Sequence, residues 1–572
     1  MGQAQTVGDA DLTARAGSTS DERPLAFTPA PVTAAPLRSA AAAAPASPIA
    51  PKSRRKTALI VGAGSSGLAA IQQALEAGLE PFCCEARPGV GGAWRYDAEP
   101  GRCEWAFSQE GEATVYTPGE SDERGPPPPS PMYASLRTNV PTTLMMYREQ
   151  HFPQNVGLFC RHDQVQNYLE DFARPFLPYI RFDTRIVSVR HTLPSDPPDA
   201  SLDTAGTDAA PSDDGFAKQR RWTASWRSTL SQDAPLETRQ FDCVFVANGH
   251  YSKPYIPYTE GLRTFTGELS HARWYRDAKQ FQDKTVLVIG NSASGYDITR
   301  ELATSIHERR QDGTVPPDSL PRIYQAARSP PALGIPWDAP DAPEYSKEVQ
   351  VFPPIRRIEG RKIEFEDGRT VDDVDCIIFA TGYYFQFPFL SPETAPFSSR
   401  PLTHAPPRPG DDAGSPPVPS AKGGLRIHHL DDRLLFYLPD PTLAFLGLPY
   451  LVIPFPLAQI QARLAALHFA SSPKLPKPLT FKPNPTMEGP NGEEDGAPET
   501  RQTVTLGHPK QFDLHDRMLR ETGDVRDEEE QGGTVEGLGG LGGERSVWGL
   551  TSEAERDLRK GAKGLRKAVL GY

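Results

Sequence analysis

The sequence predicts an α/β fold in which short Val- and Ile-rich strands alternate with amphipathic helices to build parallel sheets. Two glycine-rich loops carry this prediction, IVGAGSSGLAA at 60–70 and VIGNSASGYDI at 288–298. Each loop follows a short apolar run and opens a helical stretch, the order found in Rossmann-like dinucleotide-binding domains. The chain is therefore predicted to contain two such domains.

The composition predicts ordered domains that carry long insertions. The chain has 572 residues and 60 prolines, room for roughly two to four average domains with about twice the ordinary proline usage. Residues 1–56 are rich in Ala, Pro and Ser, and we expect them to be disordered. Four other polar, aperiodic stretches are expected to be exposed loops or linkers: 107–131, 194–219, 393–424 and 484–545.

Charge and cysteine content narrow the function. A net charge of −12 gives no reason to expect a nucleic-acid surface. Six cysteines without a CxxC pair predict neither a disulfide framework nor a metal site, and they weigh against a disulfide reductase. Cys83 and Cys84 lie in an apolar run, PFCCEA, and are expected to be small buried residues.

No membrane span is expected. The most apolar run without charge, 441–458, contains four prolines that would interrupt a spanning helix. The N-terminal residues lack the basic head and apolar run of a secretory signal. These features together predict a cytoplasmic location.

The first loop has the full context of a dinucleotide site. TALIV at 57–61 predicts a buried strand, and the spacing Gly62-x-Gly64-x-x-Gly67 leads directly into a helix. Such glycines let the backbone approach a pyrophosphate at the helix N-terminus. The following strand ends in Glu85, whose carboxylate can accept both ribose hydroxyls of an adenosine and would repel a 2′-phosphate.

The second loop differs in two ways. Ser292 replaces the central glycine and adds a hydroxyl that could meet a phosphate oxygen, and the next predicted strand, RIYQAARS at 322–329, offers Arg328 where the first offers an acid. An arginine there suits the 2′-phosphate of NADP. A protein that binds both a flavin dinucleotide and NADPH passes hydride from the nicotinamide to the flavin.

Further motifs resemble one family. The pattern F-x-G-x-x-x-H-x-x-x-Y is present at Phe265, Gly267, His271 and Tyr275. Around it lie RPGVGGAW (87–94), YASLRTNVPTTLM (133–145), VANGHYSKPYIP (246–257), DCIIFATGY (375–383) and the apolar stretch at 441–463. Over most of 57–465 apart from the loops, this set resembles the flavin-containing monooxygenases, class B flavoprotein monooxygenases, and is most similar to their fungal, thiol-oxidising branch.

The resemblance implies roles for individual residues. It implies FAD binding by Gly62, Gly64, Ser65, Ser66, Gly67, Glu85, Gly92 and Trp94, and NADPH binding by Gly290, Ser292, Ser294, Gly295 and Arg328, with Thr138, Thr381 and Gly382 as further cofactor contacts. Asn139 would lie beside the flavin ring and the nicotinamide as the catalytic residue; by its sequence alone it could equally be a turn residue before Pro141. His271 and Tyr275 are expected to be structural.

The chain order predicts an NADPH domain inserted into the FAD domain. The expected segments are the first FAD part at 57–259, the NADPH domain at 260–372, the second FAD part at 373–483, a disordered insertion at 484–545 and a C-terminal helix at 546–572. Ser552 and Glu555 form a potential capping box for that helix. Its apolar stripe, Leu558, Ala562, Leu565 and Val569, favours packing on the protein body over contact with a membrane surface.

The leading hypothesis is an FAD- and NADPH-dependent monooxygenase. The resemblance implies that reduced flavin forms a C4a-hydroperoxide, which oxygenates sulfur- or nitrogen-containing small molecules (thiols, or amines of the N,N-dimethylaniline type). Baeyer–Villiger oxidation, amine N-hydroxylation and uncoupled NADPH oxidation remain alternatives, as do a two-dinucleotide reductase and a non-catalytic scaffold whose PPPPSP stretch at 126–131 recruits a partner. The expected partners are a small-molecule substrate and O2, and the oligomeric state, homo-oligomer included, stays open.

Overall fold

The computed structural model describes residues 54–119, 125, 127–196, 221–313, 316, 319–331, 334–406, 418–484, 501–525 and 548–571. The predicted N-terminal disorder up to residue 53 lies outside the described residues. So do the greater parts of the predicted loops at 194–219 and 484–545, and the centre of the one at 393–424. From Arg55 onward the chain forms one unit.

The first sheet is parallel, with the strand order β20-β9-β1-β2-β5. Its strands are β1 (Thr57–Val61), β2 (Glu80–Cys84), β5 (Ile180–Arg181), β9 (Cys243–Val246) and β20 (Leu443–Phe445). Consecutive side chains of a strand point to opposite faces, and in β1 Ile60 belongs to one buried cluster while Leu59 belongs to another. Buried on both faces, the strand is apolar from Ala58 to Val61, in agreement with the prediction of a buried strand for TALIV.

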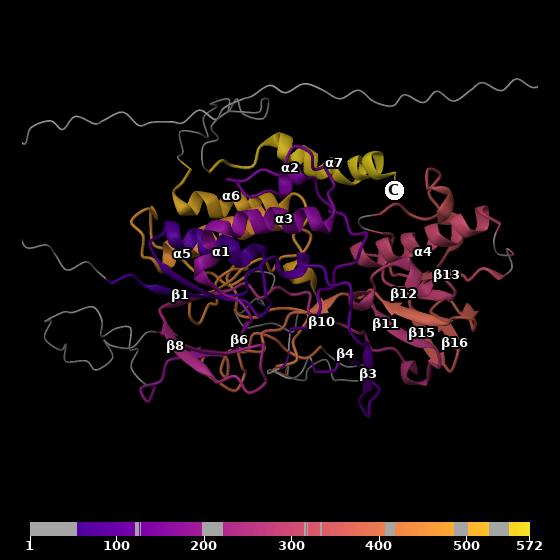
Figure 1. The fold of residues 1–572 in the computed structure, drawn as a ribbon, viewed down its shortest axis with the longest axis horizontal. Coiled ribbons are helices and arrows are strands. Elements are labelled where there is room, and N and C mark those ends of the chain that lie inside the picture. The colour runs from indigo at the N-terminus through magenta and orange to yellow at the C-terminus, as the bar shows by residue number, and fades with distance from the viewer. Residues whose placement is uncertain are drawn as a thin grey trace, which may run out of the picture. The chain divides into compact units, whose positions relative to one another are not determined.

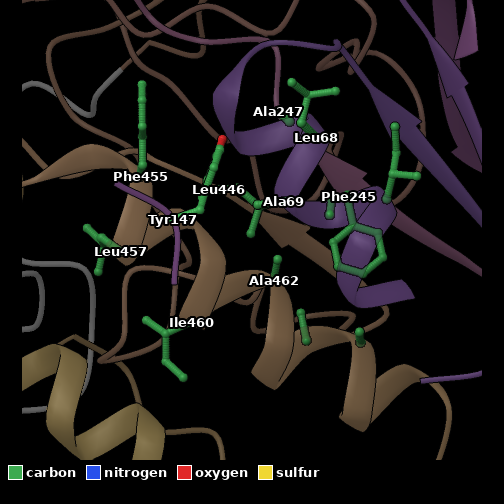
Figure 2. Close-up of a cluster of buried hydrophobic side chains, with 14 of the residues drawn as sticks. Leu68, Ala69, Tyr147, Phe245, Ala247, Leu446, Phe455, Leu457, Ile460 and Ala462 are labelled. Atoms are coloured by element: carbon green, nitrogen blue, oxygen red, sulfur yellow. The ribbon is translucent and has the colours of Figure 1, made fainter. Parts of the chain in front are cut away.

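Helices cover one face of this sheet (Figure 1). They are α1 (Ser65–Glu76), α3 (His162–Ala173), α5 (Pro454–Phe469) and α6 (Lys510–Thr522), with the short α2 (Thr142–Met145) beside them. Figure 2 shows Ala69 of α1 close to Ala462 of α5, with Phe245 of β9 beside them. Small residues at Ala69 and Ala462 let the two helices pack closely.

The opposite face is covered by the antiparallel strands β6 (Thr184–His191), β7 (Trp222–Ser228) and β8 (Glu237–Phe241). Trp222 and Trp226 of β7 and Phe241 of β8 pack against the sheet residues Val61 and Val246. The residues of the first sheet therefore lie between a helical layer and an antiparallel layer.

A second parallel sheet has the order β11-β18-β12-β13-β14. Its strands are β11 (Glu268–His271), β12 (Val286–Ile289), β13 (Ile323–Ala326), β14 (Val349–Phe352) and β18 (Cys376–Phe379). Helix α4 (Ala293–Gln311) follows β12, and a small antiparallel sheet contains β15 (Ile355–Glu359), β16 (Lys362–Phe365) and β17 (Thr370–Val371). Two Rossmann-like sheets with the second inserted into the first confirm the predicted fold class.

The two chain segments that join the sheets pair with each other. β10 (Lys253–Pro254) leads into the second sheet, β19 (Tyr383–Tyr384) leads back, and the two form an antiparallel ladder. The predicted boundary at 372/373 falls too early, because β18 is hydrogen-bonded between β11 and β12. The second domain therefore ends only after Phe379.

Two predicted loops contain regular structure. The stretch 107–131 includes β4 (Ala113–Tyr116), which pairs with β3 (Glu104–Phe107). The stretch 484–545, expected to be disordered, includes α6, which buries Phe512, Met518 and Leu519. Both predictions were wrong at these residues. The Pro- and Gly-rich sequence around each short amphipathic segment led to the prediction of a loop.

The apolar run 441–458 contains β20 and the beginning of α5, with Pro454 at the first helical position. Proline is tolerated there because the amide it lacks would have no helical partner. Among the described residues, no helix is long and apolar enough to cross a membrane.

The C-terminal helix is present as predicted. α7 (Glu553–Leu570) begins after Ser552, whose hydroxyl accepts from the Glu555 amide while the Glu555 carboxylate accepts from the Ser552 amide, a complete capping box. Within the predicted apolar stripe Ala562 is buried, whereas Val569 is exposed. Its basic side chains pair with the protein body, as at Arg556 with Asp513 and Asp516. These contacts show that the helix packs on the protein body at Arg556 and Ala562.

Candidate functional site

The first glycine loop is a tight turn, and nearby backbone atoms leave no room for a side chain at two of its glycines. Gly62 has φ of +98° and donates from its amide to the Cys84 carbonyl oxygen at 2.8 Å. A Cβ atom on Gly62 would lie 2.7 Å from the Ala247 carbonyl oxygen, and one on Gly67 would lie 1.8 Å from the Gly62 carbonyl oxygen. Only glycine at both positions lets α1 begin directly over the ends of β1 and β9.

The second loop repeats this construction. Gly290 has φ of +101° and donates to the Ala326 carbonyl oxygen at 2.8 Å. A Cβ atom on Gly290 would lie 2.7 Å from the Ala380 carbonyl oxygen, and one on Gly295 would lie 2.1 Å from the Gly290 carbonyl oxygen. Both loops thus present a helix N-terminus, a natural site for a pyrophosphate, at the carboxyl end of a parallel sheet.

Neither central position of the two loops requires glycine within the protein itself. Gly64 (φ −73°, ψ −173°) and Ser292 (φ −75°, ψ −164°) have nearly the same backbone conformation, and each is the N-cap of its helix. With negative φ neither position needs glycine for its backbone. Gly64 faces Gly92, whose Cα would lie 3.5 Å from an added Cβ, whereas Ser292 is exposed. A side chain is therefore accommodated in the second loop without a clash.

The Glu85 side chain is hydrogen-bonded to the first loop. Its side chain is only 6% exposed, and its carboxylate accepts from the Ala63 amide at 2.7 Å and the Arg87 amide at 2.9 Å. Burial raises the pKa of Glu85, while these two amides and the charges of Arg87 and Arg95 act in the opposite direction. A carboxylate has about four acceptor positions, so positions remain for the two hydroxyls of a ribose.

The Gly91–Gly92 turn lies against the same loop. The Gly91 amide donates to the Ala63 carbonyl oxygen at 3.1 Å, and both glycines have positive φ. The turn opens a short 3-10 helix, η1 (Gly92–Trp94), and the partly buried Trp94 meets Phe455 edge-on at 6.3 Å. Gly92 and Trp94 are therefore brought together with the first loop.

Ser65 and Ser66 begin helix α1. The Tyr147 hydroxyl donates to the Ser65 carbonyl oxygen at 2.5 Å. A Cβ atom on Gly447 would lie 2.6 Å from the Ser66 hydroxyl oxygen. The segment after β20 therefore runs directly past the N-terminus of α1, which agrees with a cofactor site enclosed by the apolar stretch at 441–463.

Asn139 lies in a bend two residues before Pro141. The buried Thr138 next to it donates from its amide to the Cys160 carbonyl oxygen at 3.0 Å, and the Thr142 amide donates to the Leu158 carbonyl oxygen at 2.8 Å. The partly buried side-chain amide of Asn139 makes no hydrogen bond with any described residue. Its donor and acceptor are thus available to a ligand, although the bend also agrees with the turn interpretation.

Arg328 is exposed and follows β13 by two residues. Its neighbour Ser329 accepts a hydrogen bond from the Asn291 side chain, which fixes this turn beside the second loop. Within the described part of the chain Arg328 has no ion-pair partner. Ser294 and Gly295 lie in the first turn of α4, so the structure brings every residue predicted for NADPH to one end of the second sheet.

Thr381 and Gly382 lie at the connection between the two sheets. The Gly382 carbonyl oxygen accepts from the Tyr255 amide at 2.8 Å and lies 3.2 Å from His271 Nε2, and the Thr381 hydroxyl donates to the Tyr255 carbonyl oxygen. His271 and Tyr275 are fully buried, and the Tyr275 hydroxyl donates to Glu301. These contacts agree with the structural role expected for the central motif.

Two residues beside the loops were not predicted from the sequence: Ala247 and Ala380, whose carbonyl oxygens face Gly62 and Gly290. A signal was present, since VFVANG and IIFATG each place Ala and a following glycine directly after a buried strand. Cys83 and Cys84 are buried as expected. Burial also raises the pKa of Cys84 to about 12, so this thiol stays protonated at neutral pH.

Two parallel sheets, each with a glycine loop at its carboxyl end, give the architecture of two Rossmann-like domains. The sequence matches the flavin-binding monooxygenase-like family over residues 55–118, 215–310 and 343–398. This similarity assigns the three matched segments to the flavin-binding monooxygenase-like family.

Curated relatives agree with this assignment. Flavin-containing monooxygenase 3 of Rattus norvegicus is 27% identical over 388 residues, which cover 59% of this chain and 64% of the relative's length. The thiol-specific monooxygenase of Saccharomyces cerevisiae is 25% identical over 444 residues, covering 75% of this chain and 80% of the relative.

Solved structures show the same fold. S-allyl-L-cysteine S-oxygenase from Allium sativum superimposes with a TM-score of 0.60 at 23% identity, over 90% of this chain and 94% of that one. Tmm from a Pelagibacter species superimposes with a TM-score of 0.53 at 20% identity, over 82% of this chain and 86% of that one.

Proposed function

We propose that this chain is a monooxygenase that binds FAD at the first loop and NADPH at the second, and transfers one atom of O2 to sulfur or nitrogen in a small molecule. The observation that carries the proposal is a difference in charge between two loops of the same geometry. The first loop closes on the buried carboxylate of Glu85, whereas the second lies beside the exposed guanidinium of Arg328.

The residues of the first loop fit an adenosine with free ribose hydroxyls. Gly62, Gly64 and Gly67 leave room for a pyrophosphate at the N-terminus of α1, and Glu85 is held in place by two amides with acceptor positions to spare. A 2′-phosphate would meet a carboxylate there, so the first loop disfavours NADP. Ser65, Ser66, Gly92 and Trp94 complete this candidate FAD site.

The residues of the second loop fit NADPH. Gly290, Ser294 and Gly295 repeat the turn, the Ser292 hydroxyl is exposed at the helix N-cap, and Arg328 supplies a forked cation for the 2′-phosphate. The strands β10 and β19 pair with each other between the two sheets. This pairing holds together the two domains that carry the loops. Thr381 and Gly382 lie at that connection.

When bound, the flavin accepts the electrons of NADPH and activates O2, so that substrate, O2, NADPH and a proton give oxygenated substrate, water and NADP+. The contribution proposed for Asn139 is to hydrogen-bond within the reaction site with a rigid amide that carries both a donor and an acceptor. Its buried neighbours Thr138 and Val140 exclude water around it.

For the substrate we favour thiols and other sulfur compounds. The name of the yeast relative, a thiol-specific monooxygenase, supports this choice. The apolar segment that passes α1 and continues into α5 is the part of the chain suited to line the substrate's path.

The test is NADPH consumption by the purified, flavin-loaded protein, with and without cysteamine or glutathione. We expect a flavin absorbance spectrum, consumption linked to the thiol, and one oxygenated product per NADPH. Conversion of cyclohexanone to an ester would assign Baeyer–Villiger activity, and N-oxygenation of N,N-dimethylaniline would assign amines. Stoichiometric peroxide without product for any of these compounds would replace the proposal with an NADPH oxidase.

A further inference from the structure

Tyr133, six residues before Asn139, is tied to the helix that follows the second glycine loop. Its side chain is 4% exposed, and its hydroxyl donates to an Asp297 carboxylate oxygen of α4 at 2.7 Å. Burial, followed by the negative charge of Asp297, raises the pKa of the Tyr133 phenol well above its usual value. The phenol therefore remains protonated and remains the donor in this bond.

A second bond of the same kind lies one turn further along α4. Glu301 accepts from the hydroxyl of Ser135 and, at 2.6 Å, from the hydroxyl of Tyr275. Four residues separate Asp297 from Glu301, so both carboxylates lie on one face of the helix. Arg300 lies 3.8 Å from an oxygen of Asp297 and 3.3 Å from one of Glu301, and its single positive charge offsets part of their negative charge.

On its other side the same segment is bound to the first domain. The amides of Thr138 and Thr142 donate to carbonyl oxygens just before α3, at Cys160 and Leu158. Asn139 thus lies in a short stretch whose upstream end is fixed to α4 and whose downstream end is fixed to the first domain.

Helix α4 begins at Ala293, directly after the N-cap Ser292 of the second loop. Asp297 lies in the second turn of this helix. Because a helix is rigid over such a distance, a displacement of the second loop moves Asp297, and Tyr133 moves with it.

We propose that Asp297 and Glu301 are positioning residues that set the place of Asn139 relative to the second nucleotide site through Tyr133 and Ser135. This inference rests on the proposed function for the role of Asn139. The contacts that carry it are independent of any bound cofactor. Two carboxylates on the buried side of a helix are costly unless bonded, and their partners here belong to the Asn139 segment and to the central motif.

The first test is hydrogen–deuterium exchange of the full-length Tyr133→Phe protein without added nucleotide. The substitution removes one hydroxyl and leaves the ring. We expect exchange in residues 134–142 to accelerate roughly ten- to a hundredfold, as for loss of one hydrogen bond to a buried charge. Unchanged exchange in this segment would overturn the inference, whatever the protein catalyses.

Tyr296→Phe is the matched control, because Tyr296 precedes Asp297 on α4 and its hydroxyl accepts from the Ile335 amide at 3.1 Å. We expect this variant to leave exchange in 134–142 as in the wild type. Asp297→Asn keeps an acceptor for Tyr133 and should preserve protection, whereas Asp297→Ala should lose it. Equal acceleration in all four variants would indicate general loosening and would overturn the inference.

The second test adds NADP+. In the wild type we expect protection of the second loop and also of 134–142; in Tyr133→Phe protection of the loop should be unchanged, and protection of 134–142 should be weaker than in the wild type. Protection of 134–142 to the same degree in both proteins would mean direct contact and would overturn the coupling through Tyr133. Absence of protection at the loop itself in both proteins would count against the proposed NADPH site, and the first test would still decide the positioning role.

Discussion

The Glu85 carboxylate lies 2.7 Å from the Ala63 amide nitrogen, so the residue that ends the second strand binds the residue between the first two glycines. The same carboxylate also accepts from Arg87. One buried side chain therefore fixes the shape of the first loop before any cofactor arrives, and it carries the charge by which the loop would select its nucleotide.

Replacing Glu85 by Ala should reduce both stability and FAD content. The buried Ala63 amide and the partly buried Arg87 amide would lose their acceptor, at a cost of about 1–3 kcal/mol for a buried group left unsatisfied. Urea unfolding would measure the stability and the flavin absorbance ratio of the purified protein would measure occupancy. Glu85→Gln keeps an acceptor oxygen and serves as the milder control; if it and Glu85→Ala retain full flavin, Glu85 does not hold the ribose.

Gly67→Ala should destabilise the protein far more than Gly64→Ala. The new Cβ would lie 1.8 Å from the Gly62 carbonyl oxygen in the first variant and 3.5 Å from the Gly92 Cα in the second. We expect a loss on the order of 3 kcal/mol for Gly67→Ala and less than about 1 kcal/mol for Gly64→Ala. Thermal unfolding of both variants tests this, and equal melting temperatures would contradict the close packing of α1 on the loop.

Arg328→Ala should discriminate between the two nicotinamide cofactors. Losing a charge-assisted contact with the 2′-phosphate should raise the KM for NADPH by roughly 10- to 100-fold while leaving the KM for NADH within about twofold. Arg322→Ala is a suitable control, since Arg322 is also an exposed arginine but lies before β13 and pairs with Asp373. Equal effects of Arg328→Ala on both cofactors would show that this guanidinium does not bind the 2′-phosphate.

Asn139→Ala should retain flavin and divert turnover toward hydrogen peroxide. The side chain makes no hydrogen bond within the described protein, so its removal should cost little stability while taking a donor and an acceptor from the reaction site. Peroxide and product are measured per NADPH consumed. If the ratio stays at the wild-type value, the catalytic role falls and the turn interpretation remains.

The partly buried His468 should make the protein less stable in acid. Burial first, then the charges of Lys56 and Arg433, lowers the pKa of His468 to about 4. The unfolded chain then binds the proton more readily, so stability is retained above about pH 6.5 and falls as the pH drops toward 4. At pH 4.5 this group should cost about 2–3 kcal/mol relative to pH 7.

Urea unfolding of His468→Gln at the two pH values measures that contribution. The variant should lose correspondingly less stability on acidification than the wild type does. His151→Gln, at an exposed histidine, should show the wild-type pH dependence. A His468→Gln curve parallel to the wild type would remove the assignment.

The sequence predicted what local patterns decide. Both glycine loops, their strands and the capping box of α7 follow from residues close together in the chain, and the structure contains all of them. The end of the second domain was predicted too early in the chain, before β18. The strand β18 (CIIF) is apolar on both faces and would suit either sheet. Its partners β11 and β12 are distant in sequence, and no local signal names them.

Part of the candidate site was beyond the sequence for a similar reason. That Tyr133 would meet Asp297 depends on how two domains pack, over a separation of 164 residues. Neither the sequence around Tyr133 nor the sequence around Asp297 indicates that these two residues are in contact. The motif resemblance implied a role for Asn139, but only the structure shows which residues are hydrogen-bonded to the segment that contains it.

Helix α7 connects the two domains at a second place, apart from the paired strands β10 and β19. It begins against α6, where Arg556 pairs with Asp513, and near its other end Lys567 pairs with Asp341 while Arg566 lies 3.6 Å from Asp297. A bulky fusion partner joined at the carboxyl end would therefore pull on the same carboxylate that anchors Tyr133. An affinity tag is therefore better placed away from α7.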